Sequence, residues 1–228
     1  MDFICHGVPS PGVWRQYLNE FIAHQGNKKN SVFSPSKPIV LNSIRDISRI
    51  EFRNKRLGWK KYSFALTLSV PDGHGAKNTV LLSEPYNKNI FMKGFLADLY
   101  LRPSCYACPS KCLKSGSDVT IGDYWGIQNV KPEIDDDKGI CCTIVSTSKG
   151  ISHVSRIDID KVISSYKEVF QGNPALIKSA LLSDKRSEFY KHYPNKFVQF
   201  ISHETRLPID IQCKMWIYNL LLNLKLVK

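Results

Sequence analysis

The stretch YSFALTLSV at residues 62–70, followed directly by the turn sequence PDG at 71–73, determines the sheet at the centre of the expected fold. Side chains two residues apart share one face of a β-strand, and alternate positions of this stretch are apolar: Phe64, Leu66, Leu68 and Val70. After the turn, residues 79–82 return to β-branched and apolar side chains. The two segments together predict a β-hairpin.

Further strands and helices are expected on both sides of this hairpin. Strands are expected at the following segments, the first of which reads as the end of a buried strand: 2–4, 39–41, 47–52, 119–122 and 141–146. Helical spacing of apolar residues predicts helices at 11–24, 89–99, 160–166, 174–189 and 210–228. Because no regular βαβ order appears, we expect an irregular mixed α+β fold, with a mixed sheet, flanking helices and a cysteine-rich cluster loop. The main domain is expected over 1–200, with a C-terminal helical tail over 201–228.

Composition and charge argue against a membrane protein, a secreted protein and a nucleic-acid-binding protein. No apolar run reaches the roughly 18 residues that a membrane-spanning helix needs, and the N-terminus lacks the pattern of a secretory signal. A cytoplasmic location is therefore expected, where cysteines stay reduced and clustered ones bind metals more often than they form disulfides. The net charge is +12, but the basic residues are scattered and no nucleic-acid-binding motif accompanies them. This charge suits an acidic electron carrier or a phosphorylated cofactor better than nucleic acid.

The strongest chemical signal is the loop CYACPSKC at residues 105–112. Two cysteines separated by two residues can direct both thiolates to one metal or cluster. Cys5, which lies at a strand end beside a Gly-Pro turn, could supply a distant ligand. Nearby cations would offset the negative charge of a ligated cluster: Arg102, Lys111 and Lys114. From spacing alone, an iron–sulfur cluster and a structural zinc site both remain open.

The other three cysteines are expected to pack rather than to bind a metal. Cys141 and Cys142 are adjacent in an expected strand, so their side chains point to opposite faces. Cys213 falls in the expected terminal helix. Buried free cysteines behave as small apolar residues, which gives all three a core role.

Several ordered motifs resemble a known family. They are FICHGVPS (3–10), IEFRNK (50–55), GWK (58–60), RPSCYAC (102–108), SDVTIGDYWG (117–126) and DDDKG (135–139), with the weaker NPAL (173–176) and RSEF (186–189). Their order over residues 2–189 resembles the C-terminal domain of the beta subunit of coenzyme F-420 hydrogenase/dehydrogenase. Within that family the chain looks more like the bacterial branch that accompanies polysaccharide-biosynthesis proteins.

The resemblance implies an FAD and a 4Fe-4S cluster that exchanges electrons with it. Cys5, Cys105 and Cys108 match cysteines of the family pattern, whereas Cys112 stands where relatives carry another residue; it is kept as the candidate fourth ligand. Family members also carry an upstream half, so we expect Met1 to be an internal residue of a longer protein or a truncated gene start. If the upstream half completes the pocket, the fragment alone is expected to be inactive and to bind flavin weakly or not at all.

Candidate cofactor-binding residues combine cations with an aromatic ring: Arg53, Lys55, Trp59 and Lys60, together with Asp123. Such residues suit a flavin or its diphosphate, although ordinary surface charges at a strand end explain them equally well. Asp118 and Asp123 could accept hydrogen bonds from a cofactor or cap the ends of a strand. Residues 135–138 could bind a cation or form a solvated turn. His6 could transfer a proton or have a structural role. No catalytic residue is assigned.

The leading hypothesis is an iron–sulfur flavoprotein oxidoreductase or electron-transfer subunit. Its electrons would pass between the 4Fe-4S cluster, the FAD and a carrier or substrate, with coenzyme F-420-reducing chemistry implied by the resemblance. The expected partner is a ferredoxin-like acidic carrier or a hydrogenase/dehydrogenase subunit. The alternatives are a zinc-stabilised binding module and an inactive fragment of the oxidoreductase.

Overall fold

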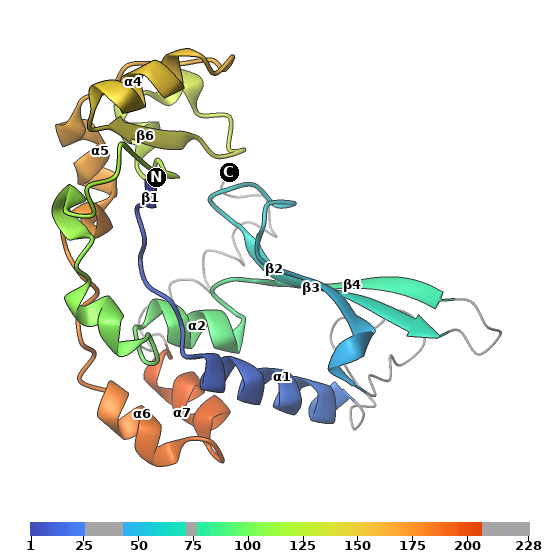
Figure 1. The fold of residues 1–228 in the computed structure, drawn as a ribbon. Coiled ribbons are helices and arrows are strands. Elements are labelled where there is room, and N and C mark those ends of the chain that lie inside the picture. The colour runs from blue at the N-terminus through green and yellow to red at the C-terminus, as the bar shows by residue number, and fades with distance from the viewer. Residues whose placement is uncertain (26–42, 72–76, 207–228) are drawn as a thin grey trace, which may run out of the picture.

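The computed structural model describes residues 1–25, 43–71 and 77–206. It is an α+β fold with flanking helices, as expected, but its strands form two small sheets rather than one mixed sheet (Figure 1). The strands are β1 (Asp2–Phe3), β2 (Ile47–Asn54), β3 (Ser63–Pro71), β4 (Lys77–Pro85), β5 (Val119–Asp123) and β6 (Cys141–Val145). The α-helices are α1 (Pro11–Gln25), α2 (Ile90–Leu96), α3 (Ile127–Val130), α4 (Ser148–Ser155), α5 (Tyr166–Gly172), α6 (Arg186–His192) and α7 (Phe197–Glu204). Short 3-10 turns lie at Ile44–Asp46, Pro103–Ala107, Lys111–Leu113, Pro132–Ile134 and Pro174–Leu176.

The expected hairpin forms the centre of the first sheet, in which β3 pairs antiparallel with both β2 and β4. Phe64, Leu66 and Leu68 are buried as the sequence predicts, and Ser63 and Ala65 on the opposite face of β3 are buried as well. Phe64, Leu66 and Leu68 belong to the larger core, which they share with residues of four helices: α1, α2, α6 and α7. Burial of this many apolar and aromatic side chains supplies most of the driving force for folding.

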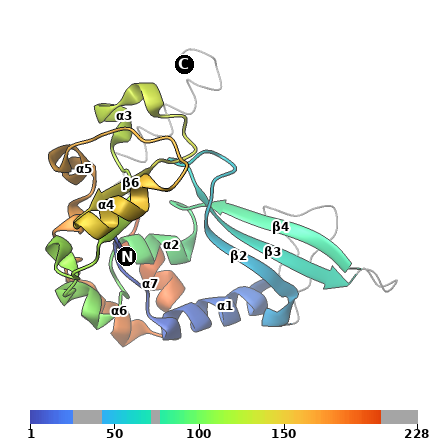
Figure 2. The ribbon, with the colours of Figure 1, turned by 45° about the horizontal axis from the view of Figure 1, so that its top comes forward.

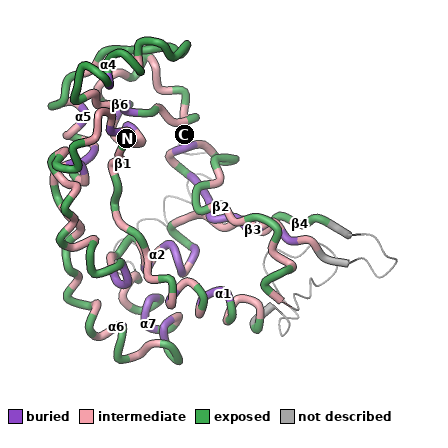
Figure 3. The backbone as a smooth tube through the Cα atoms, in the orientation of Figure 1, coloured by how far each residue is buried: buried purple, intermediate pink, exposed green. Residues whose placement is uncertain are grey.

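The second sheet is mixed: β1 runs parallel to β5, and β5 runs antiparallel to β6. Helix α4 lies beside β6 (Figure 2). Its smaller core contains Tyr124, Ile127, Cys142 and Val169, together with Trp59 from the connection between β2 and β3. The β2–β3 connection of the first sheet therefore inserts one large side chain into the core of the second. Figure 3 shows that α4 and the chain after it are largely exposed.

Three further expectations from the sequence need correction. Phe3 is 60% exposed, so the first strand is present but is not buried. Residues 160–165 are not helical, because Ser165 caps the next helix through a capping box with Glu168 and so starts α5 at Tyr166. The expected helix over 174–189 is split into a 3-10 turn and α6, with irregular chain between them.

The split has a physical cause in the cysteine loop. Ala180 donates its backbone N–H to the Cys105 carbonyl at 3.3 Å, and the Ser179 hydroxyl accepts the Cys108 N–H at 3.1 Å. This segment therefore bonds to the loop rather than closing helical turns. The strand expected at 39–41 and the tail helix expected over 210–228 lie outside the described residues. Across the described ranges, no helix is both long and apolar enough to cross a membrane.

Candidate cofactor cavity and cysteine loop

A cavity of about 560 Å³ lies between the two sheets. Its walls come from β2, the connection between β2 and β3, and α2 on one side, and from the ends of β5 and α5 on the other. Most of its lining is aromatic or apolar, including Phe52, Tyr62, Tyr86, Phe91, Phe95 and Trp125. The acidic and basic lining residues are His6, Arg53, Lys60 and Asp123. A space of this size with few polar groups is typical of a small-molecule or cofactor site.

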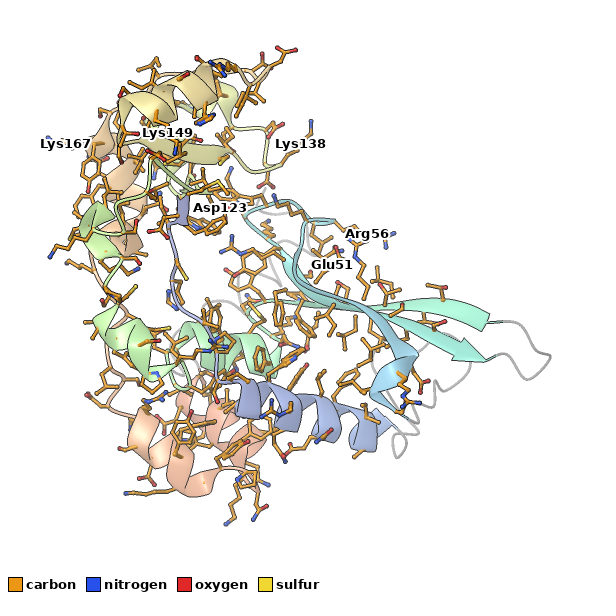
Figure 4. All side chains as sticks on the ribbon, viewed as in Figure 1. Glu51, Arg56, Asp123, Lys138, Lys149 and Lys167 are labelled. Atoms are coloured by element: carbon orange, nitrogen blue, oxygen red, sulfur yellow. The ribbon has the colours of Figure 1, made fainter. Side chains whose placement is uncertain are left out.

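Arg53 is the best-held polar residue of the wall. Its guanidinium carbon lies 5.1 Å from the centre of the Tyr62 ring and 4.9 Å from that of Trp125. It also donates a hydrogen bond to Asp123, which lies where β5 approaches the β2–β3 connection (Figure 4). Burial raises the pKa of Tyr62, although the neighbouring Arg53 opposes this rise. Two rings and a carboxylate therefore fix the guanidinium at the cavity.

Trp59 supports this wall from behind. It is 1% exposed, and its ring stacks on Trp125 with centroids 4.2 Å apart. Gly139, at a φ of +91°, faces the ring so closely that a Cβ there would lie 2.6 Å from Trp59 Cδ1. Trp59 does not line the cavity, so it positions Trp125 instead of contacting a ligand.

The acidic run 135–137 holds the β2–β3 connection in place. The Asp137 carbonyl accepts the Trp59 N–H at 2.7 Å, and its Oδ1 accepts the Lys60 N–H at 3.0 Å. The ammonium of Lys60 donates to Asp135, and this hydrogen bond holds the pKa of Asp135 below its ordinary value. The run therefore serves as a clamp on the hairpin connection.

The structure thus separates the five residues predicted to bind a cofactor. Arg53, Lys60 and Asp123 line the cavity, and Trp59 lies behind it. Lys55 is not part of the lining, and its ammonium donates to the Lys138 carbonyl at 3.1 Å.

Sequence reasoning did not single out Trp125, Tyr62 or His6 as cofactor-binding residues. Trp125 could have been found from its position two residues after Asp123, at the end of a strand. His6 contacts Asp98, with Nε2 at 2.8 Å from Oδ1, and packs edge-on against Phe95.

The segments that carry the predicted metal ligands lie side by side. Val8 donates its N–H to Cys105 Sγ at 3.3 Å, which joins the N-terminal segment to the loop. The Lys111 ammonium donates to the carbonyls of Cys5 (2.7 Å) and Ala175 (2.6 Å). Cys112 Sγ lies 3.5 Å from the Ile177 carbonyl. Three distant parts of the sequence therefore meet here through main-chain contacts.

The sulfur atoms themselves do not converge on one point. Among the described residues, no group of three or more His, Cys, Asp or Glu side chains is placed to hold a metal ion. The ligand set Cys5, Cys105, Cys108 and Cys112 therefore stays a prediction, and this arrangement does not fit a bound cluster.

The remaining cysteines differ in exposure. Cys142 is buried, as expected for a packing role, and burial raises the pKa of its thiol to about 11. Cys141 is exposed because the alternation of β6 turns it away from the core, so its expected core role is wrong. Cys213 lies outside the described residues.

A comparison of the chain with protein-family models, with curated proteins and with solved structures found no match. The function is therefore argued from the cavity and from the cysteine loop.

Proposed function

We propose that the chain is a flavin-binding oxidoreductase or electron-transfer subunit that holds the flavin ring in the cavity between the two sheets. The observation that carries this proposal is the fixed stack of Arg53 with Trp125 and Tyr62 on a cavity of about 560 Å³. Aromatic walls suit a flat conjugated ring, and a guanidinium suits its polar edge. A bound flavin would supply the hydride or electron transfer, while the protein would orient it and set its electrostatics.

The described residues divide this work between them. The aromatic lining would exclude water from the faces of a ring. Arg53 and Lys60, each paired with a carboxylate, would donate their remaining N–H groups to the polar edge of the ring. His6, fixed by Asp98 and Phe95, lies on the same lining. None of these roles requires the cysteines.

The proposal also includes a 4Fe-4S cluster. The described thiols, as they lie in this structure, do not form a site for it. Metal ligation often orders its own ligands, because the binding free energy is also folding free energy. No electron-transfer step is therefore assigned to the cysteines here.

The proposed electron-transfer partner is a ferredoxin-like acidic carrier or a hydrogenase/dehydrogenase subunit, in the cytoplasm. Arg102 and Lys114 are exposed beside the cysteine loop and provide positive charge for docking. Lys111 is turned toward the main chain of Cys5 and Ala175, so it adds less to that rim than expected. Electron exchange should slow as salt screens the rim over about 10 Å at 0.1 M ionic strength.

Anaerobic purification followed by an absorption spectrum, metal analysis and titration with FAD tests the proposal. We expect saturable quenching of flavin fluorescence with a dissociation constant of about 1–100 µM, because Trp125 and Tyr62 would contact the ring. Trp125→Leu should weaken the quenching, whereas Tyr166→Leu, at an exposed ring, should not. A colourless zinc-containing protein without flavin affinity would instead support a binding module. A metal-free protein that folds but binds no flavin would indicate an inactive fragment.

A further inference from the structure

We propose that the cavity accepts only the uncharged ring system of a flavin, and that Asp123 excludes the phosphate groups from it. This inference rests on the proposed function, because it concerns which part of the flavin nucleotide enters the same cavity. It predicts that the ligand is recognised at its ring and that any phosphate tail lies outside.

The first step is the charge balance of the lining. Its basic or titratable side chains are His6, Arg53 and Lys60, and each already faces a carboxylate. Arg53 donates to Asp123 and Lys60 donates to Asp135. His6 Nε2 lies 2.8 Å from Asp98 Oδ1. Among the described lining residues, therefore, no cation is left without an acidic neighbour.

The second step is the cost of bringing a phosphate into this space. A phosphate site normally offers free guanidinium or ammonium groups, or a row of backbone N–H groups. Here a phosphate bonded to Arg53 would lie beside the Asp123 carboxylate, which bonds the same guanidinium on the same lining. Repulsion between these like charges next to aromatic walls makes a phosphate unfavourable at this position.

The third step is the fit of a neutral ring. The guanidinium of Arg53 carries five N–H donors, so its bond to Asp123 leaves others for carbonyl oxygens at a ring edge. The rings of Trp125 and Tyr62 have their centres 4.9 Å and 5.1 Å from the carbon of that guanidinium and continue the wall. An uncharged ring gains stacking and hydrogen bonds without breaking an ion pair.

Asp123 is the residue that sets this preference, because it is the acidic member of the lining. Its side chain is 37% exposed and ends a strand, so replacing the carboxylate by an amide of the same shape should leave the fold intact. Asp123→Asn removes the negative charge and makes the positive charge of Arg53 available to a phosphate. The same change should therefore turn a ring site into a ring-and-phosphate site.

The test is a fluorescence titration of the full chain with riboflavin and with FMN, followed by competition with ADP. We expect riboflavin and FMN to bind with dissociation constants within about threefold of each other, and millimolar ADP not to displace riboflavin. Tenfold tighter binding of FMN, or displacement by ADP, would overturn the inference while leaving the proposed function in place. Failure of both flavins to bind would overturn the proposed function as well.

Two variants and one control complete the test. In Asp123→Asn, the affinity for FMN should rise about tenfold relative to the affinity for riboflavin, which is the effect of one charge-assisted contact. In Arg53→Gln, which leaves Asp123 unpaired, the affinity for FMN should fall about tenfold relative to the affinity for riboflavin. Asp136→Asn, an exposed carboxylate outside the lining, should leave the ratio unchanged. An unchanged ratio in both Asp123→Asn and Arg53→Gln would show that this pair does not set the preference.

Discussion

The wall of the cavity and the cysteine loop are assembled in different ways. At the wall, side chains contact one another directly: Trp59 on Trp125, and Arg53 between Trp125 and Tyr62. At the loop, the contacts run through main-chain groups and the Lys111 ammonium, while the sulfurs stay apart. Among the described residues, the fold therefore brings the aromatic side chains of the cavity wall into contact, but it brings together no group of three or more metal-binding side chains.

The largest expected effect comes from removing the ring that supports the wall. Trp59→Ala should lower the free energy of unfolding by about 3–5 kcal/mol, because it leaves a large void in the smaller core. Urea unfolding measures this, with Tyr166→Ala, whose ring is partly exposed, expected to change stability by less than about 1 kcal/mol. Equal losses in the two variants would show that the wall does not depend on Trp59.

The loop should respond less to the loss of its central cation. Lys111→Met removes two hydrogen bonds that join Cys5 and Ala175 to the loop, and should cost about 1–2 kcal/mol of unfolding free energy. The matched control is Lys114→Met, at an exposed lysine three residues further along the same loop. If both variants unfold at the same urea concentration, Lys111 does not hold these segments together.

At the cavity wall, Arg53 should contribute a similar or smaller amount to the free energy of unfolding. Arg53→Met should destabilise the chain by about 1 kcal/mol through its lost contacts with Tyr62 and Trp125, since the site is partly exposed to solvent. Arg56→Met, at an exposed arginine in the same connection, is the control. A greater loss in the control would place the stabilising cation outside the cavity.

Thiol labelling distinguishes the buried cysteine from the exposed one without changing the sequence. Burial raises the pKa of Cys142 to about 11, so almost none of it is thiolate at pH 8, whereas Cys141 is exposed. Mass spectrometry after alkylation should show Cys141 modified at least about tenfold faster. Similar rates in the folded chain would contradict the assigned burial.

The smallest expected effect is a dependence on acid pH at the clamp. The pKa of Asp135 is lowered by Lys60, so its contribution is present above the unfolded value of about 3.9 and is lost as pH falls through the lower folded value. Tryptophan fluorescence at Trp59 and Trp125 should therefore begin to change only below about pH 4. In Asp135→Asn this step should be absent, and its persistence there would assign it to another carboxylate.

The sequence predicted the parts of the fold that depend on local patterns. The alternation around Leu66 predicted the hairpin, because side chains two residues apart share one face of a strand. The start of α5 differs from the prediction. The apolar spacing of residues 160–166 predicts an earlier helix, whereas the capping box of Ser165 with Glu168, which is also a local signal, sets the start at Tyr166.

The candidate site was harder to predict, since its contacts join residues far apart in the sequence. Arg53 and Lys60 were recognised as candidates, but their partners Asp123 and Asp135 lie at least 70 positions away. No local pattern shows that Trp59 enters the core of the second sheet, so the sequence alone predicts a cofactor contact there. The cavity could therefore be identified only from the tertiary structure.

The most direct test of the central claim is a crystal structure of the chain with riboflavin. The ring should lie in the cavity between the two sheets, in contact with Trp125 and with its polar edge at Arg53. A ring bound elsewhere, or a cavity left empty at saturating riboflavin, would contradict the assignment of this cavity as the flavin site.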